Sequence, residues 1–88
     1  HAVYTDVWTS MGSEHEAGMR RERFRAYQVT PRLMALADAK AVFMHCLPAH
    51  RGEEVTDAVL DGPQSRIWPQ ATNRLSSARG VLHFLATQ

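Results

Sequence analysis

The feature that most constrains the fold is a short apolar run, Val42–Pro48, with the sequence VFMHCLP. Polar residues precede this run, and Pro48 ends it because proline has no N–H to donate to a strand ladder. The length and the flanks favour a buried strand over a helix. In open α/β sheets, ligands bind beyond the carboxyl ends of the strands. The run therefore predicts that His45, Cys46 and the Leu47 carbonyl lie at an edge where chemistry takes place.

The rest of the sequence alternates between strand and helix patterns. Runs of β-branched and aromatic residues predict strands, and apolar residues at helical spacing predict helices. Such alternation indicates an α/β fold with a parallel sheet and right-handed crossovers. We expect strands over 1–8, 42–47 and 66–68, and helices over 14–27, 31–39, 56–60 and 73–86. In the helices over 31–39 and 73–86, the apolar residues at helical spacing are expected to form buried stripes.

Composition and charge set aside several function classes. The chain has 88 residues and 44% hydrophobic residues, as expected of one small globular domain. Ten basic and nine acidic residues leave a net charge of +1, which gives no general field for binding nucleic acid or an anionic membrane. No apolar run approaches the roughly 20 residues of a membrane span. One cysteine cannot form an internal disulfide, so a cytoplasmic protein is expected.

Three kinds of chemistry are open to His45, Cys46 and His50. One thiolate and two imidazoles are plausible zinc ligands, although neighbouring strand residues point to opposite faces. A cysteine nucleophile would need a base within reach, and for the same reason His45 is poorly placed for that role. A small-molecule pocket lined by the thiol and strand-end carbonyls is the third, and a buried cysteine that only packs is the plain alternative.

Asp6 falls near the end of the first expected strand, with Ser10 and Gly12 just beyond it. A carboxylate at that edge could meet a cationic ligand. An Asp and a Ser at this spacing also serve ordinary turns. Spacing alone leaves both readings open.

Four segments of the chain together resemble, in order, motifs of the ornithine carbamoyltransferase family. The resemblance implies a Rossmann-like fragment, namely part of a doubly wound parallel sheet with flanking helices. It also implies that residues 1–88 are the carboxyl-terminal part of the ornithine-binding domain, without the carbamoyl-phosphate-binding domain. The matching segments are Asp6–Gly12 (DVWTSMG), Tyr27–Val29 (YQV), Phe43–Val55 (FMHCLPAHRGEEV) and Gln70–Leu75 (QATNRL).

The same resemblance implies an activity. Members of the family transfer the carbamoyl group from carbamoyl phosphate to the δ-amine of ornithine, giving citrulline and phosphate in arginine biosynthesis or the urea cycle. No cofactor and no metal are implied, and the full-length subunits are expected to form a homotrimer. Without a phosphate-binding domain, residues 1–88 alone are expected to be inactive.

Roles in binding ornithine follow from the resemblance at three positions. Asp6 resembles the carboxylate that helps to hold ornithine. Ser10 and Met11 resemble a mobile loop that closes on the amino-acid end of the substrate.

Roles at the reacting carbamoyl group follow in the same way. Cys46 and Leu47 resemble the pair beside the reacting centre, with the Leu47 carbonyl accepting a hydrogen bond from the carbamoyl amide. Arg74 resembles the arginine that reaches the carbamoyl oxygen, so Cys46 and Arg74 are the expected catalytic residues. The chain departs from the family at Thr72, where a glutamate is usual, and this change could loosen how Arg74 is held.

Two other functions stay open from the sequence. The chain could belong to another amino-acid carbamoyltransferase of the same superfamily. It could also be a non-catalytic remnant that interacts with partner subunits.

Overall fold

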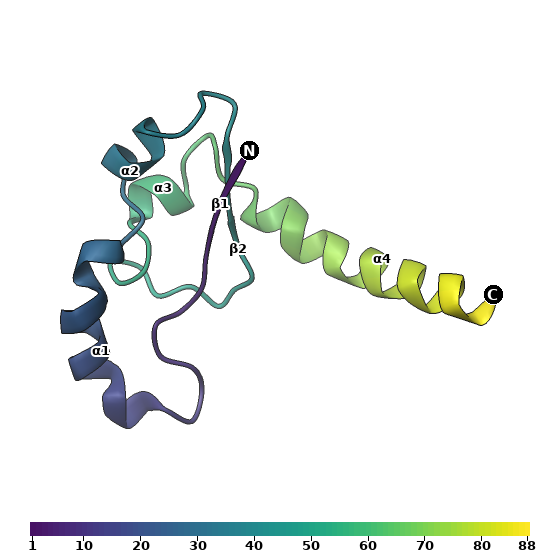
Figure 1. Ribbon diagram of the computed structural model, residues 1–88, viewed down its shortest axis with the longest axis horizontal. Coiled ribbons are helices and arrows are strands. Elements are labelled where there is room, and N and C mark those ends of the chain that lie inside the picture. The colour runs from purple at the N-terminus through teal and green to yellow at the C-terminus, as the bar shows by residue number, and fades with distance from the viewer.

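The structure is a computed structural model that describes residues 1–88. Two short strands alternate with helices, and one long helix closes the chain (Figure 1). The elements, in order, are β1 (Ala2–Thr5), the 3₁₀ helix η1 (Glu14–Glu16), α1 (Ala17–Phe24), the 3₁₀ helix η2 (Arg25–Tyr27), α2 (Pro31–Ala35), β2 (Val42–His45), α3 (Asp57–Leu60) and α4 (Ile67–Ala86).

The two strands pair in parallel and form the only sheet. Ala2 lies opposite Val42, and the register continues to Thr5 opposite His45. The predicted α/β class with a parallel sheet is therefore confirmed, and the chain is a fragment of a Rossmann-like domain. Because parallel strands end at the same edge, the residues that follow β1 and β2 emerge side by side.

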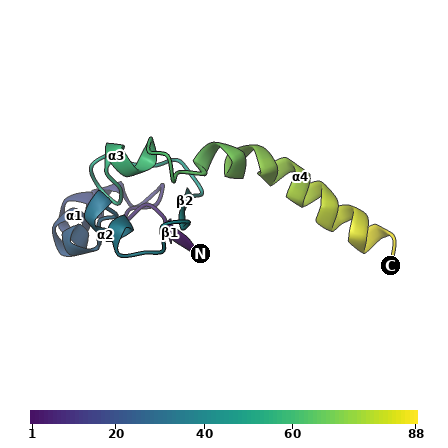
Figure 2. The ribbon, with the colours of Figure 1, turned by 90° about the horizontal axis from the view of Figure 1, so that it is seen from above.

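The helices lie unevenly around this sheet. Figure 1 shows α1, α2 and α3 to one side of the strands, whereas α4 extends away on the other. In the perpendicular view of Figure 2, α4 still projects from the body over most of its length. The radius of gyration is 15.5 Å, against about 12 Å for a compact chain of this length. The projecting helix accounts for this extended shape.

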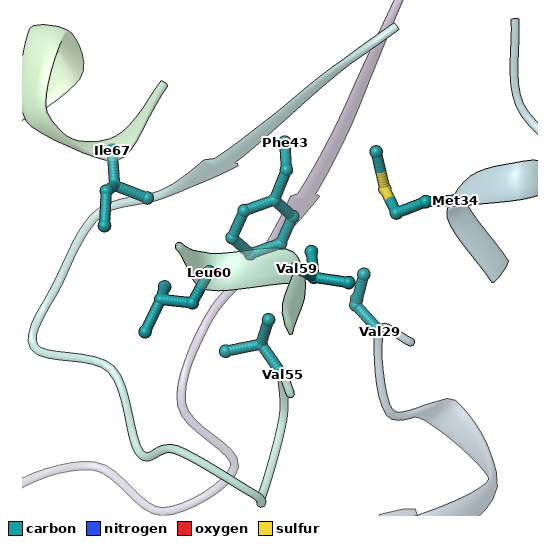
Figure 3. Packing of buried hydrophobic residues seen from close by; sticks show 7 residues of the cluster. All are labelled: Val29, Met34, Phe43, Val55, Val59, Leu60 and Ile67. Carbon is teal, nitrogen blue, oxygen red and sulfur yellow. The ribbon is translucent and has the colours of Figure 1, made fainter. Parts of the chain in front are cut away.

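The hydrophobic core lies between β2 and the short helices. Figure 3 shows the Phe43 ring in the middle of the cluster, close to Val59 and Leu60 of α3. Full burial of such side chains stabilises the fold by about 1.5–3 kcal/mol each. Only 11 of the 88 residues are buried, so this core is small. Its seven hydrophobic members are Val29, Met34, Phe43, Val55, Val59, Leu60 and Ile67.

The strand expected over 66–68 was wrong. Ser65 makes only an isolated parallel bridge with Phe43, and Ile67 is already the first residue of α4. In the sequence, Pro69 directly after Ile67 and Trp68 is typical of the end of a strand. Proline is equally suited to the first turn of a helix, where its missing N–H has no partner to lose, and that is where Pro69 lies.

The buried stripes expected on α2 and α4 were also wrong. Helix α2 ends at Ala35 and buries only Met34, whereas Leu36, just beyond its end, is 82% exposed. Helix α4 buries only Ile67. Helical spacing gave the correct element in both cases, but it did not show whether a partner covers the apolar face.

One helix expected in the first half of the chain is confirmed, and local hydrogen bonds stabilise the helices there. The helix predicted over 14–27 is present as η1, α1 and η2 in succession, and Arg20 Nε donates to Glu16 Oε2 at 2.9 Å. Thr30 caps α2, because its hydroxyl accepts from the Leu33 N–H at 3.2 Å. None of the helices combines the length and the apolar character that crossing a membrane requires.

Candidate functional site

The carboxyl edge of the sheet brings Asp6 and Cys46 together. Each residue directly follows a strand, and the last register pair before them is Thr5 with His45. A carboxylate oxygen of Asp6 and the Cys46 sulfur lie within 4.8 Å of each other. Both residues are exposed, so a ligand can reach this pair from solvent.

The surroundings of Cys46 disfavour its thiolate form. Partial desolvation, followed by the polar and charge interactions with Asp6, raises the pKa of the Cys46 thiol above its usual value, while Tyr4 acts in the opposite direction. The thiolate is the nucleophilic form of cysteine. A raised pKa therefore argues against Cys46 as a covalent nucleophile and suits a thiol that donates or packs.

His45 is fully buried, with a ring nitrogen within 4.8 Å of the Cys46 sulfur. Its Nδ1 accepts from the Leu47 N–H at 2.8 Å, and its Nε2 lies 2.8 Å from Glu54 Oε1. Because Nδ1 accepts, the hydrogen-bond network assigns the ring proton to Nε2, which donates to Glu54. With both nitrogens engaged, His45 cannot serve as the base for Cys46.

Leu47 has a backbone conformation that is unusual for its type. Its φ is +60°, and the peptide bond that joins it to Pro48 is cis. For a residue with a side chain, the left-handed region costs roughly 1–2 kcal/mol. The hydrogen bond from the Leu47 N–H to His45 Nδ1 helps to hold this conformation. It therefore also helps to fix the direction of the Leu47 carbonyl.

Glu54 closes the loop that follows β2. It is fully buried, and its Oε1 also accepts from the His50 N–H at 2.8 Å. Its Oε2 is buried without a hydrogen-bond partner. One carboxyl group therefore ties the end of β2 to the returning chain.

Gln70 connects the first turns of α4 to both strands. Its Oε1 accepts from the His45 N–H at 3.0 Å, and its Nε2 donates to the Tyr4 hydroxyl at 3.1 Å. Arg74 lies four residues later and so on the same face of the helix. Arg74 is exposed and makes neither a hydrogen bond nor an ion pair. Thr72 is likewise exposed, and its side chain makes no hydrogen bond with Arg74.

Ser10 and Met11 lie on the loop between β1 and η1, apart from the strand edge. Neither side chain hydrogen-bonds to Asp6 or Cys46, and Met11 is 90% exposed. The loop turns at Gly12, whose φ is +92°. Met11 and His50 both line a cavity of about 160 Å³, and Cys46 does not line that cavity.

The three residues considered as zinc ligands, His45, Cys46 and His50, do not form one site. Cys46 groups with Asp6 and His45, whereas His50 groups with Glu53 and Glu54. Within the first group, a metal would have to break one of the two hydrogen bonds that His45 makes. The geometry therefore argues against a zinc site and a cysteine nucleophile, which leaves the small-molecule site of the three chemistries.

Sequence reasoning missed two residues that shape this edge. No element is expected over residues 48–55, where Glu54 lies, and no local pattern marks its side chain as buried. Gln70 falls outside the helix expected over 73–86, because Pro69 just before it is typical of a break, whereas the structure includes it in α4. The partners of Gln70 lie 25 and 66 residues away in the sequence. Those of Glu54 are only nine and four residues away, but the contacts depend on how the loop between them folds.

Comparison with known proteins identifies one family. Residues 1–85 match the family described as aspartate/ornithine carbamoyltransferase, Asp/Orn binding domain. The ornithine carbamoyltransferase of Pyrobaculum aerophilum is 63% identical over 83 residues, which are 94% of this chain and 27% of that protein. The chain thus spans about a quarter of the length of the curated relatives that it matches.

Solved structures agree in fold. The ornithine carbamoyltransferase from Pyrococcus furiosus superimposes with a TM-score of 0.82 at 57% identity, over 92% of this chain and 26% of that one. The anabolic ornithine carbamoyltransferase from Campylobacter jejuni gives a TM-score of 0.89 at 35% identity, over 99% of this chain and 29% of that one. In both structures a much longer chain contains the fold described above.

Proposed function

The chain belongs to the aspartate/ornithine carbamoyltransferase family, and we propose that it forms the ornithine-binding part of an ornithine carbamoyltransferase. The proposed reaction transfers a carbamoyl group from carbamoyl phosphate to the δ-amine of ornithine. The amine nitrogen attacks the carbonyl carbon, the bond from that carbon to the phosphate oxygen breaks, and the nitrogen loses a proton. The products are citrulline and phosphate.

The observation that carries this proposal is the pairing of Asp6 with Cys46 at the strand edge. The family includes aspartate as well as ornithine carbamoyltransferases. A carboxylate at the mouth of the site attracts a cationic amine and repels a dicarboxylic substrate. Asp6 therefore favours ornithine over aspartate as the acceptor.

Leu47 and Arg74 are proposed to act on the carbamoyl group from two sides. The Leu47 carbonyl, fixed by its backbone conformation, accepts a hydrogen bond from the carbamoyl amide. Arg74 lies on the face of α4 that contacts the strand edge through Gln70, and it donates to the carbonyl oxygen. A donor at that oxygen stabilises the negative charge that builds as the amine attacks.

Carbamoyl phosphate is proposed to be held mainly by a domain outside residues 1–88. The residues that directly follow the two strands, Asp6, Cys46 and Leu47, include no basic side chain. The relatives are also about four times as long as the matched segment. The exposed loop at Ser10 and Met11 is proposed to close over ornithine and exclude water from the reactive acyl phosphate. Assembly as a homotrimer is part of the same proposal.

A chimera tests the function directly. In it, this chain replaces the matching 83 residues of the Pyrobaculum aerophilum enzyme. We expect the folded chimera to form citrulline from carbamoyl phosphate and ornithine, and to form no carbamoyl-aspartate from aspartate. A folded chimera that makes neither product, or that prefers aspartate, would contradict the proposal.

One observation favours a second function, that of an interaction unit. Helix α4 leaves most of its apolar residues exposed, among them Leu75, Leu82 and Leu85. Such a stripe requires a protein partner in the assembled molecule. An inactive chimera that nevertheless assembles into stable oligomers would support this second function over catalysis.

A further inference from the structure

We propose that Glu54 is a positioning residue for carbamoyl transfer, acting through the imidazole of His45 on the backbone of Leu47. The inference rests on the proposed function, because it concerns the carbonyl that faces the carbamoyl amide. Glu54 itself is buried and does not touch the substrate.

A continuous set of hydrogen bonds carries the inference. Glu54 Oε1 accepts from His45 Nε2 at 2.8 Å, and His45 Nδ1 in turn accepts from the Leu47 N–H at 2.8 Å. The amide of Leu47 is thereby held two residues beyond the end of β2, where φ is +60°. Each contact depends on the one before it.

The imidazole tautomer is the element that Glu54 controls. With an acceptor at Nε2, the proton stays on that nitrogen and Nδ1 is free to accept. Without Glu54, the tautomer with the proton on Nδ1 becomes accessible. That proton would face the Leu47 N–H, so two donors would oppose each other. Leu47 would then lose the bond that opposes relaxation of its left-handed backbone, and its carbonyl would shift.

The cost of burying Glu54 points to a role beyond stability. Its Oε2 is buried with no partner, and its nearest side-chain partner is a neutral ring rather than a cation. Well-packed apolar residues often stabilise a fold as well as buried polar groups do, or better. Glu54 also holds the His50 N–H at 2.8 Å, so the same carboxyl fixes both ends of the loop that carries Cys46 and Leu47.

The test compares three variants in the chimera described above. Glu54→Met removes the acceptor at similar size, and we expect kcat to fall by roughly ten- to a hundredfold because a small displacement of a substrate-orienting group has effects of this order. The KM for ornithine should change by less than about threefold, since Asp6 is untouched. Glu54→Gln keeps a carbonyl acceptor for both N–H groups and should restore kcat to within about threefold of wild type. Glu53→Met is the matched control, and it should leave kcat unchanged.

A spectroscopic measurement separates positioning from simple stability. In wild-type chimera labelled with ¹⁵N-histidine, the His45 signals, assigned by their loss in His45→Asn, should show a neutral ring with its proton on Nε2. A proton on Nδ1 would overturn the inference, even if Glu54→Met fails to fold. If the wild-type chimera is active and folded Glu54→Met has an unchanged kcat, the inference is overturned but the proposed function is not. Folded but inactive wild type would instead overturn the proposed function, and this inference with it.

Discussion

The carboxylate of Asp6 and the thiol of Cys46 lie within 4.8 Å of each other, at the ends of two parallel strands. Because Asp6 contributes to the raised pKa of the Cys46 thiol, Asp6→Asn should lower that pKa. Desolvation, the largest cause, remains in the variant, so the pKa should still lie above its usual value. The rate of alkylation by iodoacetamide as a function of pH measures this pKa.

Asp61→Asn is the matched control for this measurement, since Asp61 pairs with Arg51 rather than with Cys46. It should leave the pKa of the Cys46 thiol unchanged. If Asp6→Asn leaves the pKa where it was or raises it, the interaction between the two side chains is absent in solution.

A second prediction concerns substrate binding by Asp6. In the chimera, Asp6→Asn should raise the KM for ornithine and leave the KM for carbamoyl phosphate nearly unchanged. Losing one charge-assisted hydrogen bond costs about 1.5–3 kcal/mol, which corresponds to roughly ten- to a hundredfold. Steady-state kinetics with each substrate varied in turn checks this. Equal weakening of both substrates would mean that Asp6 has a structural role.

Whether a feature of this strand edge could be predicted depends on how far apart in the sequence the interacting residues lie. The strand at Val42–His45 was readable because a short apolar run ended by proline is a local pattern. Parallel strands end at the same edge of a sheet, so the residues that follow two such strands lie at one edge. The structure agrees, since it places Asp6 beside Cys46. The sequence could therefore predict which residues meet at the edge.

The hydrogen bonds that hold this edge could not be predicted in the same way. Gln70 bonds to His45 across 25 residues and to Tyr4 across 66. The choice of partner there depends on where α4 packs, which helical spacing does not determine. For the same reason the apolar residues of α4 were expected to be buried, although the described chain offers them no partner.

A third prediction concerns residues 1–88 by themselves. If carbamoyl phosphate is bound mainly elsewhere, the purified 88-residue chain should form no citrulline from carbamoyl phosphate and ornithine. A colorimetric citrulline assay measures this, with the chimera as the positive control. Turnover by the isolated chain, after contaminating host enzyme has been excluded, would show that the phosphate-binding site lies within these residues.

A fourth prediction concerns the ion pairs of Arg51 with Asp57 and Asp61, at 2.8 Å and 2.6 Å. The Arg51 guanidinium lowers the pKa of Asp61, so this carboxylate stabilises the folded state above its unfolded pKa. That contribution is lost as the pH falls through the lowered value. Wild type should therefore have a higher urea midpoint than Asp61→Asn at pH 6, and the difference should vanish in strong acid.

Salt provides the control for this ion-pair prediction. Because Arg51 and Asp61 are exposed, 1 M NaCl should reduce the difference at pH 6 by screening. A difference in urea midpoint that persists at pH 2 and in high salt would show that the asparagine acts through packing rather than charge.

The last prediction separates Cys46 from Arg74 and so tests the mechanism of transfer. Direct attack by the ornithine amine needs no nucleophile from the protein, and the raised pKa of Cys46 disfavours its thiolate. Cys46→Ser should therefore act mainly on ornithine affinity, with a modest loss of kcat. Arg74→Ala should lower kcat by roughly a hundred- to a thousandfold, since losing a donor to a developing oxyanion costs about 2.7–4 kcal/mol.

Kinetics of both variants in the chimera decide between direct transfer and a covalent route. Arg79→Ala, on the same helix, is the control for a lost positive charge and should leave kcat unchanged. A covalent nucleophile at Cys46 would accumulate a carbamoylated enzyme that mass spectrometry detects, and Cys46→Ser would nearly abolish turnover. If Cys46→Ser lowers kcat more than Arg74→Ala does, or if a carbamoyl group is found on Cys46, then transfer is not direct.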